Sequence, residues 1–204
     1  MPSRSSTAPS SPKRAAVQAA VLRATEQLLG EGATYADLNI ERIATRAGIS
    51  RTAFYFYFAD KRELLMRLTE DVTDQLYAQG DIWYSGSGDD PEAEIREAMV
   101  NIAGLYEEHG TLLRAIVEVT TYDDEVAAFW RTLLNRFVEA TRARIAAEVG
   151  TGKSSVPDPA ATSFALCWMA ERVLYQRLVQ GAPITREDLV DALVRIFMRT
   201  IYDR

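Results

Sequence analysis

The chain has 204 residues, of which 48% are hydrophobic and 25% are charged, and its net charge is -6. This composition excludes a disordered chain, and the length allows one large or two small domains. The net charge alone argues against a simple nucleic-acid-binding protein. The charges are distributed unevenly, however: residues 1–68 hold ten Lys and Arg and six Asp and Glu, whereas the remaining residues hold thirteen Lys and Arg and twenty-three Asp and Glu. This asymmetry indicates a basic module joined to an acidic body, with chance variation in surface charge as the alternative.

The sequence lacks the features of a secreted or membrane-embedded chain. Cys167 is the one cysteine, so no disulfide can form within the chain. No apolar run approaches the ~20 residues of a membrane span, and the Ser- and Pro-rich first twelve residues lack the apolar core of a secretory signal. By elimination we expect a cytoplasmic protein that does not contact a membrane.

The first half of the chain reads as an arm followed by helices. Residues 1–12 are expected to form a flexible arm, and a helical pattern then runs from about Lys13 to Gly30. The later helices of this half are predicted at about 40–47, 51–57 and 60–79. The stretch from Gly80 to Pro91 holds three glycines and several polar residues, which predicts a linker.

The second half is also helical. Helices are predicted at about 92–108, 111–119, 124–149 and 160–180, with a loop from Gly150 to Pro159. A last helix begins after Thr185, which can cap it together with Asp188. No segment alternates as a strand would. We therefore predict an all-α fold of about nine helices, with an N-terminal three-helix domain over 13–60 and a C-terminal six-helix domain over 61–204.

The most informative stretch runs from Asn39 to Phe58. Four apolar residues share one face of a short helix: Ile40, Ile43, Ala44 and Ala47. Asn39 is a good N-cap for that helix, and Gly48 can take the left-handed conformation that ends it. Ser50 can then cap a second helix. A helix, a short glycine-containing turn and a second helix form the arrangement that places the second helix in the major groove of DNA.

The second helix of this motif has two distinct faces. Phe54, Tyr57 and Phe58 have the spacing of residues that pack inward. The opposite face carries Arg51, Thr52, Tyr55 and Phe56. Arginine and tyrosine on an exposed face suit contacts with phosphates or base edges. In the alternative interpretation, the aromatic residues of both faces all belong to the core.

The segment IERIATRAGISRTAFYFYFADKRELL, residues 40–65, resembles the DNA-binding signature of the TetR family of transcription regulators. Tyr55, Phe58, Lys61 and Leu64 match its Tyr-x-x-Phe, Lys and Leu. The resemblance implies a ligand-controlled dimeric regulator, most often a repressor, and a contact between Lys61 and a phosphate. The DNA-binding residues that follow from the motif and the resemblance together are Asn39, Ser50, Arg51, Thr52, Ala53, Tyr55, Phe56 and Lys61.

Some positions near this motif differ from the family pattern or extend it. Asn39 stands where many relatives have Thr or Ser, but it can still cap the helix. Phe56 stands where a polar or basic residue is common, so contact with a sugar or a thymine methyl group is expected in place of hydrogen-bonded base readout. The N-terminal basic residues Arg4, Lys13 and Arg14 could reach the minor groove. Disorder of this arm is the favoured interpretation.

The acidic body resembles the EthR-like subgroup of the family, in the segments EVAAFW (125–130), WMAERVLY (168–175) and TIY (200–202). The two resemblances together imply a helix-turn-helix DNA-binding domain over 13–60 and a ligand-binding and dimerisation domain over 61–204. The second domain is expected to contain a hydrophobic tunnel whose occupancy alters DNA affinity. Cys167 and Ala170 stand where the subgroup has amide side chains, so we expect a small hydrophobic effector. The positions that fall on the tunnel are Ile95, Met99, Ile102, Tyr106, Trp130, Phe137, Thr141, Cys167 and Trp168, and ordinary core packing is the alternative for each.

The last two helices carry apolar residues on more than one face. By the family resemblance they form a four-helix bundle with a second subunit, and a two-fold dimer would present two reading helices to a palindromic operator. A ligand bound more tightly by the state that does not fit the operator would release DNA. The helix from Asp60 to Gln79 links the two domains, so we expect it to transmit ligand binding to the DNA-binding domain.

Two other classes of protein compete with the regulator. A carrier of lipids or other hydrophobes could keep the fold without DNA binding, although the basic N-terminal part argues against this. A helical enzyme could use Glu171 and Arg172 in an apolar pocket, although these adjacent charges more readily pair within or between subunits. A single histidine, His109, with a single cysteine makes no convincing zinc site. We therefore expect no catalytic residues, no metal and no cofactor.

Overall fold

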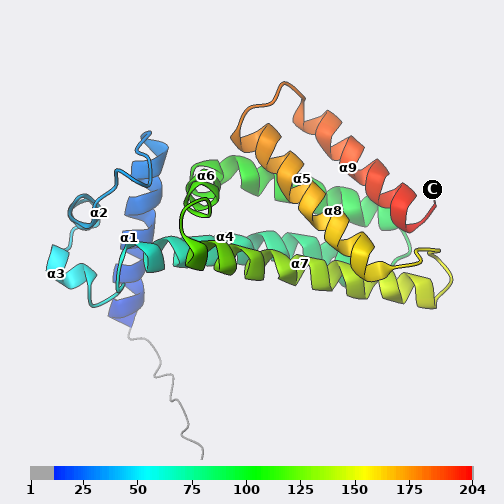
Figure 1. Cartoon of the computed structure of the whole chain (residues 1–204), viewed down its shortest axis with the longest axis horizontal. Helices are drawn as coiled ribbons and strands as arrows, with labels where there is room; N and C mark the ends of the chain where they lie inside the picture. Colours follow the sequence, from blue (N-terminus) through cyan, green and yellow to red (C-terminus); the bar gives the residue numbers. More distant parts are fainter. Residues whose placement is uncertain (1–11, 204) are drawn as a thin grey trace, which may run out of the picture. The chain divides into compact units, whose positions relative to one another are not determined.

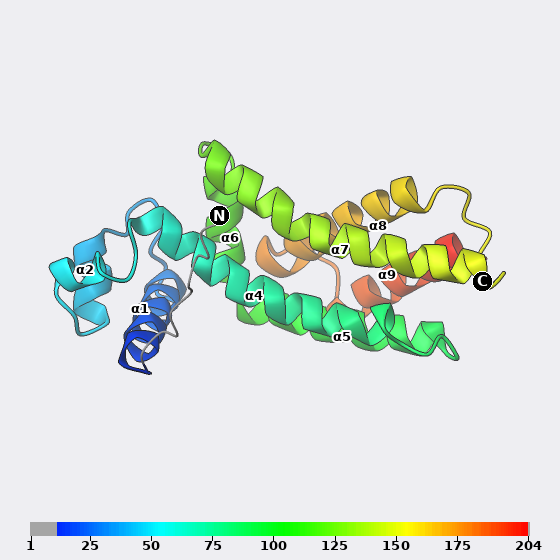
Figure 2. The same cartoon turned by 90° about the horizontal axis from the view of Figure 1, so that it is seen from below.

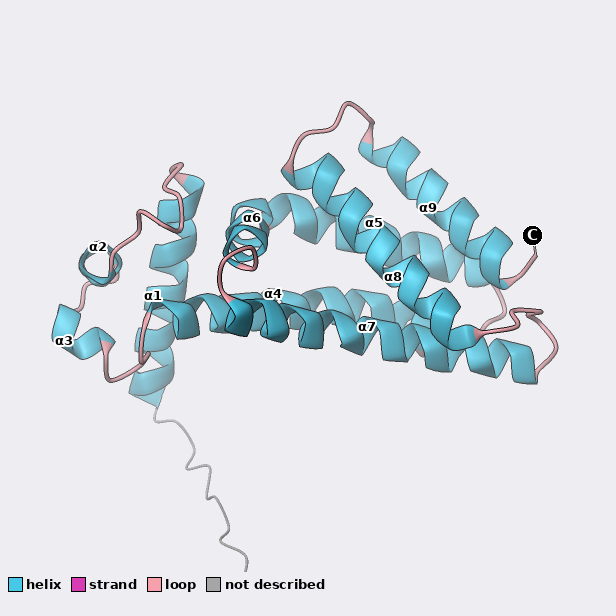
Figure 3. Cartoon of the chain, viewed as in Figure 1, coloured by secondary structure: helices cyan, strands magenta, loops and turns pink. Residues whose placement is uncertain are grey.

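The structure is a computed structural model that describes residues 12–203. Over this range the fold is all-α, with nine α-helices, one π-helical turn and no strand (Figure 3). The chain divides between Leu65 and Met66 into two compact units, called here the N-terminal unit and the body. The predicted arm, residues 1–12, lies outside the described residues except for its last position.

The N-terminal unit contains three short elements around a small core. They are α1 (Pro12–Gly30), α2 (Ile40–Arg46) and α3 (Arg51–Phe54), shown in blue and cyan in Figure 1. Val21 and Leu28 from α1, Ile43 from α2 and Phe54 from α3 are each no more than 1% exposed. Phe58 joins them with its ring centroid 5.4 Å from that of Phe54. The apolar spacing seen in the sequence therefore builds the core that holds α3 in place.

The second helix of the motif is shorter than predicted. It ends at Phe54 and not at Tyr57. At Phe56 and Tyr57 the backbone hydrogen bonds join residues three apart in place of four, as in a tighter turn. The N–H of Phe56 donates to the carbonyl of Ala53 at 3.1 Å, and that of Tyr57 donates to Phe54 at 2.9 Å. The tighter winding leaves Tyr57 half-buried and not packed inward as predicted.

The body contains six α-helices, the first of which, α4 (Lys61–Tyr84), begins in the N-terminal unit. Within the body α7 packs along α8, and α5 packs along α9 (Figures 1 and 2). The predicted cap of α9 is confirmed, since the hydroxyl of Thr185 accepts the N–H of Asp188 at 3.0 Å. The remaining elements are α5 (Pro91–Glu108), α6 (Gly110–Val119), α7 (Asp124–Gly150), α8 (Pro159–Leu174), the π-helical turn η1 (Tyr175–Val179) and α9 (Arg186–Ile201).

The linker predicted from Gly80 begins later than expected. Helix α4 continues through Gly80 to Tyr84, and the connection to α5 spans only residues 85–90. A Cβ atom at Gly80 would lie 2.7 Å from Cε2 of Tyr84, closer than side chains approach. The glycine therefore makes room for the Tyr84 ring inside a helix, and the prediction that it ends the helix was wrong.

The single helix predicted at 160–180 is divided. Helix α8 ends at Leu174, and η1 follows with a five-residue hydrogen bond from the N–H of Gln180 to the carbonyl of Tyr175 at 3.1 Å. The wider turn keeps both Tyr175 and Val179 buried. The guanidinium of Arg114 donates to the carbonyl of Val179 at 2.5 Å, which supplies a partner at the end of the turn.

A buried cluster of charged groups ties α7 to α5 and to the loop before α5. Arg144, 7% exposed at its side chain, places Nε 2.8 Å from Oε1 of Glu148 and Nη2 3.3 Å from Oε2 of Glu94. Its Nη1 donates to the carbonyl of Gly86 at 2.7 Å, and the hydroxyl of Tyr202 donates to Glu148 at 3.2 Å. The cluster satisfies charges that would be costly to bury alone.

Candidate functional site

The turn between α2 and α3 has the geometry that the sequence predicts. Asn39 Oδ1 accepts the N–H of Arg42 at 2.8 Å, and Ser50 Oγ accepts the N–H of Ala53 at 3.0 Å. Gly48 has a φ of +71°, a left-handed conformation that glycine adopts without strain. The caps and the glycine together fix where α3 begins and which of its faces is exposed.

The exposed face of α3 carries the predicted group of Arg51, Thr52, Tyr55 and Phe56. Arg51 and Thr52 are exposed, Tyr55 is 47% exposed and Phe56 is 74% exposed. The alternative that the aromatic residues from 54 to 58 are all core is therefore wrong. Exposed aromatic side chains beside an arginine are unusual on a free surface and indicate contact with another molecule.

Lys61 has partners that sequence analysis missed. Its ammonium donates to the carbonyls of Tyr35 at 2.7 Å, Leu38 at 2.9 Å and Ala36 at 3.2 Å, and it lies 4.7 Å from the centre of the Tyr35 ring. Burial lowers the pKa of Lys61, with Asp37 opposing the shift. An ammonium has three N–H donors, so each of them has a protein partner here. The phosphate contact stays a prediction, and Lys61 also fixes the loop before α2.

The N-terminal basic residues divide between the helix and the undescribed part of the chain. Lys13 and Arg14 belong to α1, so they are not part of an arm. The guanidinium carbon of Arg14 lies 5.9 Å from the centre of the Tyr57 ring, within the range of a cation–π contact. Arg4 lies outside the described residues. Whether the arm contacts DNA therefore stays a prediction.

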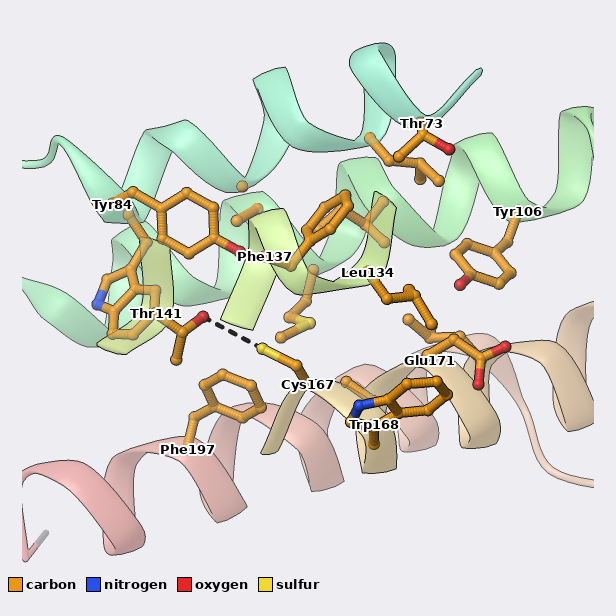
Figure 4. A pocket seen from close by; sticks show the side chains of 18 of the residues that line it. Thr73, Tyr84, Tyr106, Leu134, Phe137, Thr141, Cys167, Trp168, Glu171 and Phe197 are labelled. Carbon is orange, nitrogen blue, oxygen red and sulfur yellow. Dashed lines mark hydrogen bonds between the residues drawn. The ribbon is translucent and has the colours of Figure 1, made fainter. Parts of the chain in front are cut away.

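The body contains a cavity between α4, α5, α7, α8 and α9 (Figure 4). The cavity has a volume of about 80 Å³, and its wall is mostly apolar. All the predicted tunnel residues border this cavity, namely Ile95, Met99, Ile102, Tyr106, Trp130, Phe137, Thr141, Cys167 and Trp168.

Most other lining residues were not singled out from the sequence. Trp83 and Tyr84 were assigned to the predicted linker. Glu171 was placed in an apolar pocket only in the enzyme alternative, with ion pairing favoured, and Ala170 was named through the family resemblance; both line the cavity. The other residues that complete the lining are Thr73, Leu76, Gly80, Ala98, Leu134, Leu174 and Phe197.

Most polar groups in the cavity are already paired or uncharged. The thiol of Cys167 donates to the hydroxyl of Thr141 at 3.3 Å. Burial raises the pKa of Cys167 to about 11, with the Thr141 hydrogen bond opposing the shift. Burial also raises the pKa of Tyr84 and that of Tyr106. These groups stay neutral near pH 7, so this part of the cavity suits binding and not acid–base or thiol chemistry.

Two further features bear on function. None of the helices that the structure describes is long and apolar enough to cross a membrane. Among the described residues, no group of three or more His, Cys, Asp or Glu side chains is placed to hold a metal ion.

Comparison with known proteins places the chain in a family. Residues 95–203 match the family model described as the C-terminal domain of the transcriptional regulator EthR, and residues 21–68 match that of bacterial regulatory proteins of the tetR family. The HTH-type transcriptional regulator EthR of Mycolicibacterium smegmatis is 32% identical over 189 residues, which cover 91% of this chain and 86% of that protein. EthR of Mycobacterium tuberculosis (strain CDC 1551 / Oshkosh) is also 32% identical, over 90% of this chain and 86% of its own length.

Solved structures agree on the fold. A TetR-family regulator from Syntrophomonas wolfei has a TM-score of 0.74 at 18% identity, covering 90% of this chain and 93% of its own. SmeT, the repressor of the Stenotrophomonas maltophilia efflux pump SmeDEF, has a TM-score of 0.70 at 17% identity, covering 89% and 88%. Members of the family are transcription regulators and not enzymes. This chain belongs to the TetR family of DNA-binding transcriptional regulators, in the group of EthR.

Proposed function

We propose that this protein is a repressor that binds a palindromic operator as a homodimer and releases it when a small hydrophobic effector enters the cavity of the body. The exposed face of α3 is the observation that carries the proposal, because it combines a basic residue with two uncovered aromatic side chains on a capped helix. The cavity supports the second half of the proposal. Such a regulator acts in the cytoplasm, where the DNA is.

The proposed DNA contacts divide by chemistry. Arg51 and the hydroxyl of Tyr55 suit phosphates or base edges. Phe56 suits a thymine methyl group or a sugar, because its exposed ring offers no hydrogen bond. The caps position the helix. The residues proposed for this surface are Asn39, Ser50, Arg51, Thr52, Ala53, Tyr55, Phe56 and Lys61.

Replacing Tyr55 by alanine is expected to weaken binding to the DNA upstream of the protein's own gene by roughly 5- to 150-fold. The substitution removes a half-exposed ring and its hydroxyl, and the one ring contact that it takes from the core is the edge-on contact with Phe54 at 5.7 Å. The measurement is fluorescence anisotropy with labelled DNA at several salt concentrations. Affinity of the wild-type protein should fall steeply with salt, because neutralised phosphates release counterions.

The matched control is Tyr122→Ala, which removes a 67% exposed tyrosine from the body. This variant should bind DNA as the wild type does. Lys61 is a poorer probe, because its removal also breaks three hydrogen bonds within the fold. The opposite result would favour the carrier of hydrophobes. In that case the protein would bind this DNA, and sequences selected from a random pool, only weakly. Neither salt nor Tyr55→Ala would change that binding.

The proposed dimer surface lies on α8 and α9, which run side by side in opposite directions (Figure 1). Phe164 of α8 is 54% exposed and Ile196 of α9 is 39% exposed, whereas the apolar neighbours Leu166 and Phe197 are buried. Each helix therefore presents one apolar face to the body and leaves another uncovered. An uncovered apolar face on two adjacent helices suits a self-complementary two-fold contact.

The double variant Phe164→Glu, Ile196→Glu is expected to be monomeric at micromolar concentration, because paired charges cannot be buried against their own copies. Its DNA affinity should fall with the loss of the second half-site. Sedimentation equilibrium gives the mass. The control is Ile184→Glu, which places one charge at a 49% exposed loop position. A dimeric double variant would contradict the proposed surface.

Release of DNA is proposed to follow a shift between two states of the dimer. An effector that binds the state unfit for the operator more tightly changes DNA affinity in proportion to that difference. A coupling of ~1–3 kcal/mol corresponds to roughly 5- to 150-fold. We assign the transmission to α4, because this one helix begins in the N-terminal unit and lines the cavity with Gly80 and Tyr84.

A further inference from the structure

The apolar wall of the cavity contains one carboxylate. Glu171 of α8 lines the cavity and is only 5% exposed. Neither Oε1 nor Oε2 of this side chain has a hydrogen-bond partner. Buried carboxylates in folded proteins are nearly always paired and hydrogen-bonded, so this one calls for a physical account.

Glu171 forms an ion pair with Arg172 but no hydrogen bond to it. Nε of Arg172 lies 3.7 Å from Oε2 of Glu171, beyond hydrogen-bond distance, and the Arg172 side chain is 52% exposed. Burial raises the pKa of Glu171, and the charge of Arg172 opposes that shift only as the second cause. The carboxylate therefore keeps unused acceptor capacity on its cavity side.

Trp168 and Tyr106 line the same end of the cavity as Glu171. Nε1 of Trp168 is buried and has no hydrogen-bond partner. The hydroxyl of Tyr106 lies in the cavity, and the carboxylate of Glu171 is one cause that raises the pKa of Tyr106, second to burial. Figure 4 shows Tyr106, Trp168 and Glu171 together at one end of the cavity, apart from the paired Thr141 and Cys167.

This end of the cavity has the chemistry of a site for an organic cation. A carboxylate accepts hydrogen bonds from a protonated amine, and such charge-assisted bonds are the strong ones. The rings of Trp168 and Tyr106 also attract a cation that lies over their faces. The remaining wall, which includes Phe137 and Leu134, is apolar and suits a hydrocarbon chain.

We propose that the effector is an elongated hydrophobe with one protonated amine, held with its ammonium group at Glu171 and its apolar chain along the rest of the cavity. The inference rests on the proposed function in taking the cavity as the effector site, and it narrows the expected hydrophobic effector to a cationic amphiphile. A hydrophobic acid would be repelled by Glu171. A neutral hydrophobe would leave the carboxylate with its ion pair to the half-exposed Arg172 and with no hydrogen bond.

The test compares three ligands of equal chain length: octylamine, octanol and octanoate. All three tryptophans of the chain, Trp83, Trp130 and Trp168, line the cavity, so intrinsic fluorescence reports its occupancy without a label. Titrations are made at pH 7 without DNA, where the amine is protonated and the acid ionised. Octylamine is expected to bind about 10- to 100-fold more tightly than octanol, and octanoate more weakly than both.

The variant Glu171→Gln keeps the shape of the side chain and removes its charge. It should bind octylamine and octanol within about threefold of each other. The control Glu118→Gln removes an exposed carboxylate outside the cavity and should keep the full preference. Circular dichroism checks that each variant is folded. If a variant does not fold, the comparison of the three ligands on the wild-type protein still tests the proposal.

Three results would overturn the inference: wild-type protein that binds octanol as tightly as octylamine, wild-type protein that binds no octylamine, or a folded Glu171→Gln variant that keeps the preference. The readout needs no DNA, so it is independent of the proposed repressor role. Loss of the amine preference with intact salt-dependent DNA binding rejects the cationic effector alone. If octylamine binds in the cavity but the protein binds no DNA, the proposed repressor function is rejected and the proposed amine site is retained.

Discussion

Replacing Arg144 by alanine is expected to lower the free energy of unfolding by about 3–5 kcal/mol. Its guanidinium lies between two carboxylates, those of Glu148 and Glu94, whose side chains are 7% and 16% exposed. Removing the cation leaves both negative charges in a poorly solvated place and also frees the carbonyl of Gly86. The measurement is guanidinium chloride unfolding followed by far-ultraviolet circular dichroism at a fixed protein concentration.

The control for this prediction lies two residues away on the same helix. Arg142 is 51% exposed and pairs with Glu139 one turn before it. Exposed pairs of this kind contribute little, so Arg142→Ala should change stability by no more than about 0.5 kcal/mol. Equal effects of the two substitutions would show that the buried cluster around Arg144 has no special role in holding α7 to α5.

Phe54 and Phe56 are expected to give opposite results when each is replaced by alanine. Phe54 is 0% exposed, so its removal leaves a cavity in the core of the N-terminal unit and should cost about 3–5 kcal/mol. Phe56 is 74% exposed, and Phe56→Ala should stay within about 0.5 kcal/mol of the wild type. Thermal unfolding followed by circular dichroism measures both.

DNA binding separates the two variants in the other direction. At a temperature where both are folded, Phe56→Ala should weaken operator binding, because the exposed ring is part of the proposed contact surface. Phe54→Ala should bind normally as long as it stays folded. A Phe56→Ala variant with unchanged DNA affinity would remove this residue from the proposed surface, and a stable Phe54→Ala variant would contradict the described core.

The helix-turn-helix could be predicted closely from sequence because local chemistry determines it. The caps at Asn39 and Ser50 and the left-handed turn at Gly48 act within a few residues, and the structure contains all three. The length of α3 could not be predicted. After Phe54 the chain winds into tighter turns that leave Phe58 buried beside Phe54, and no cap or glycine in the sequence marks that change.

The errors in the body have similar causes. Gly80 reads as a helix end, and only the position of the Tyr84 ring explains why the helix continues. The π-helical turn after Leu174 depends on burial of Tyr175 and Val179 together. Both features arise from contacts within the folded body and not from propensity, so a single sequence does not reveal them.

The cavity shows where family resemblance adds to physical reasoning from residues. Apolar helical faces look the same whether they pack on protein or line a space, and only the resemblance separated the two for residues such as Ile102 and Phe137. The ion pair favoured for Glu171 and Arg172 is present, with Nε of Arg172 3.7 Å from Oε2 of Glu171. The sequence placed Glu171 in an apolar pocket only in the alternative interpretation of the protein as an enzyme.

Helix α3 holds four residues, fewer than an isolated helix can sustain in water. Its conformation therefore depends on the Ser50 cap and on two buried rings, and the positions on its outer face contribute almost nothing to folding. Substitutions at Arg51, Thr52 or Phe56 therefore hardly change the stability of the fold, so selection for stability does not remove them. Proteins that evolve from such a regulator can therefore bind new operator sequences through substitutions at these few residues, while the fold of the N-terminal unit is unchanged.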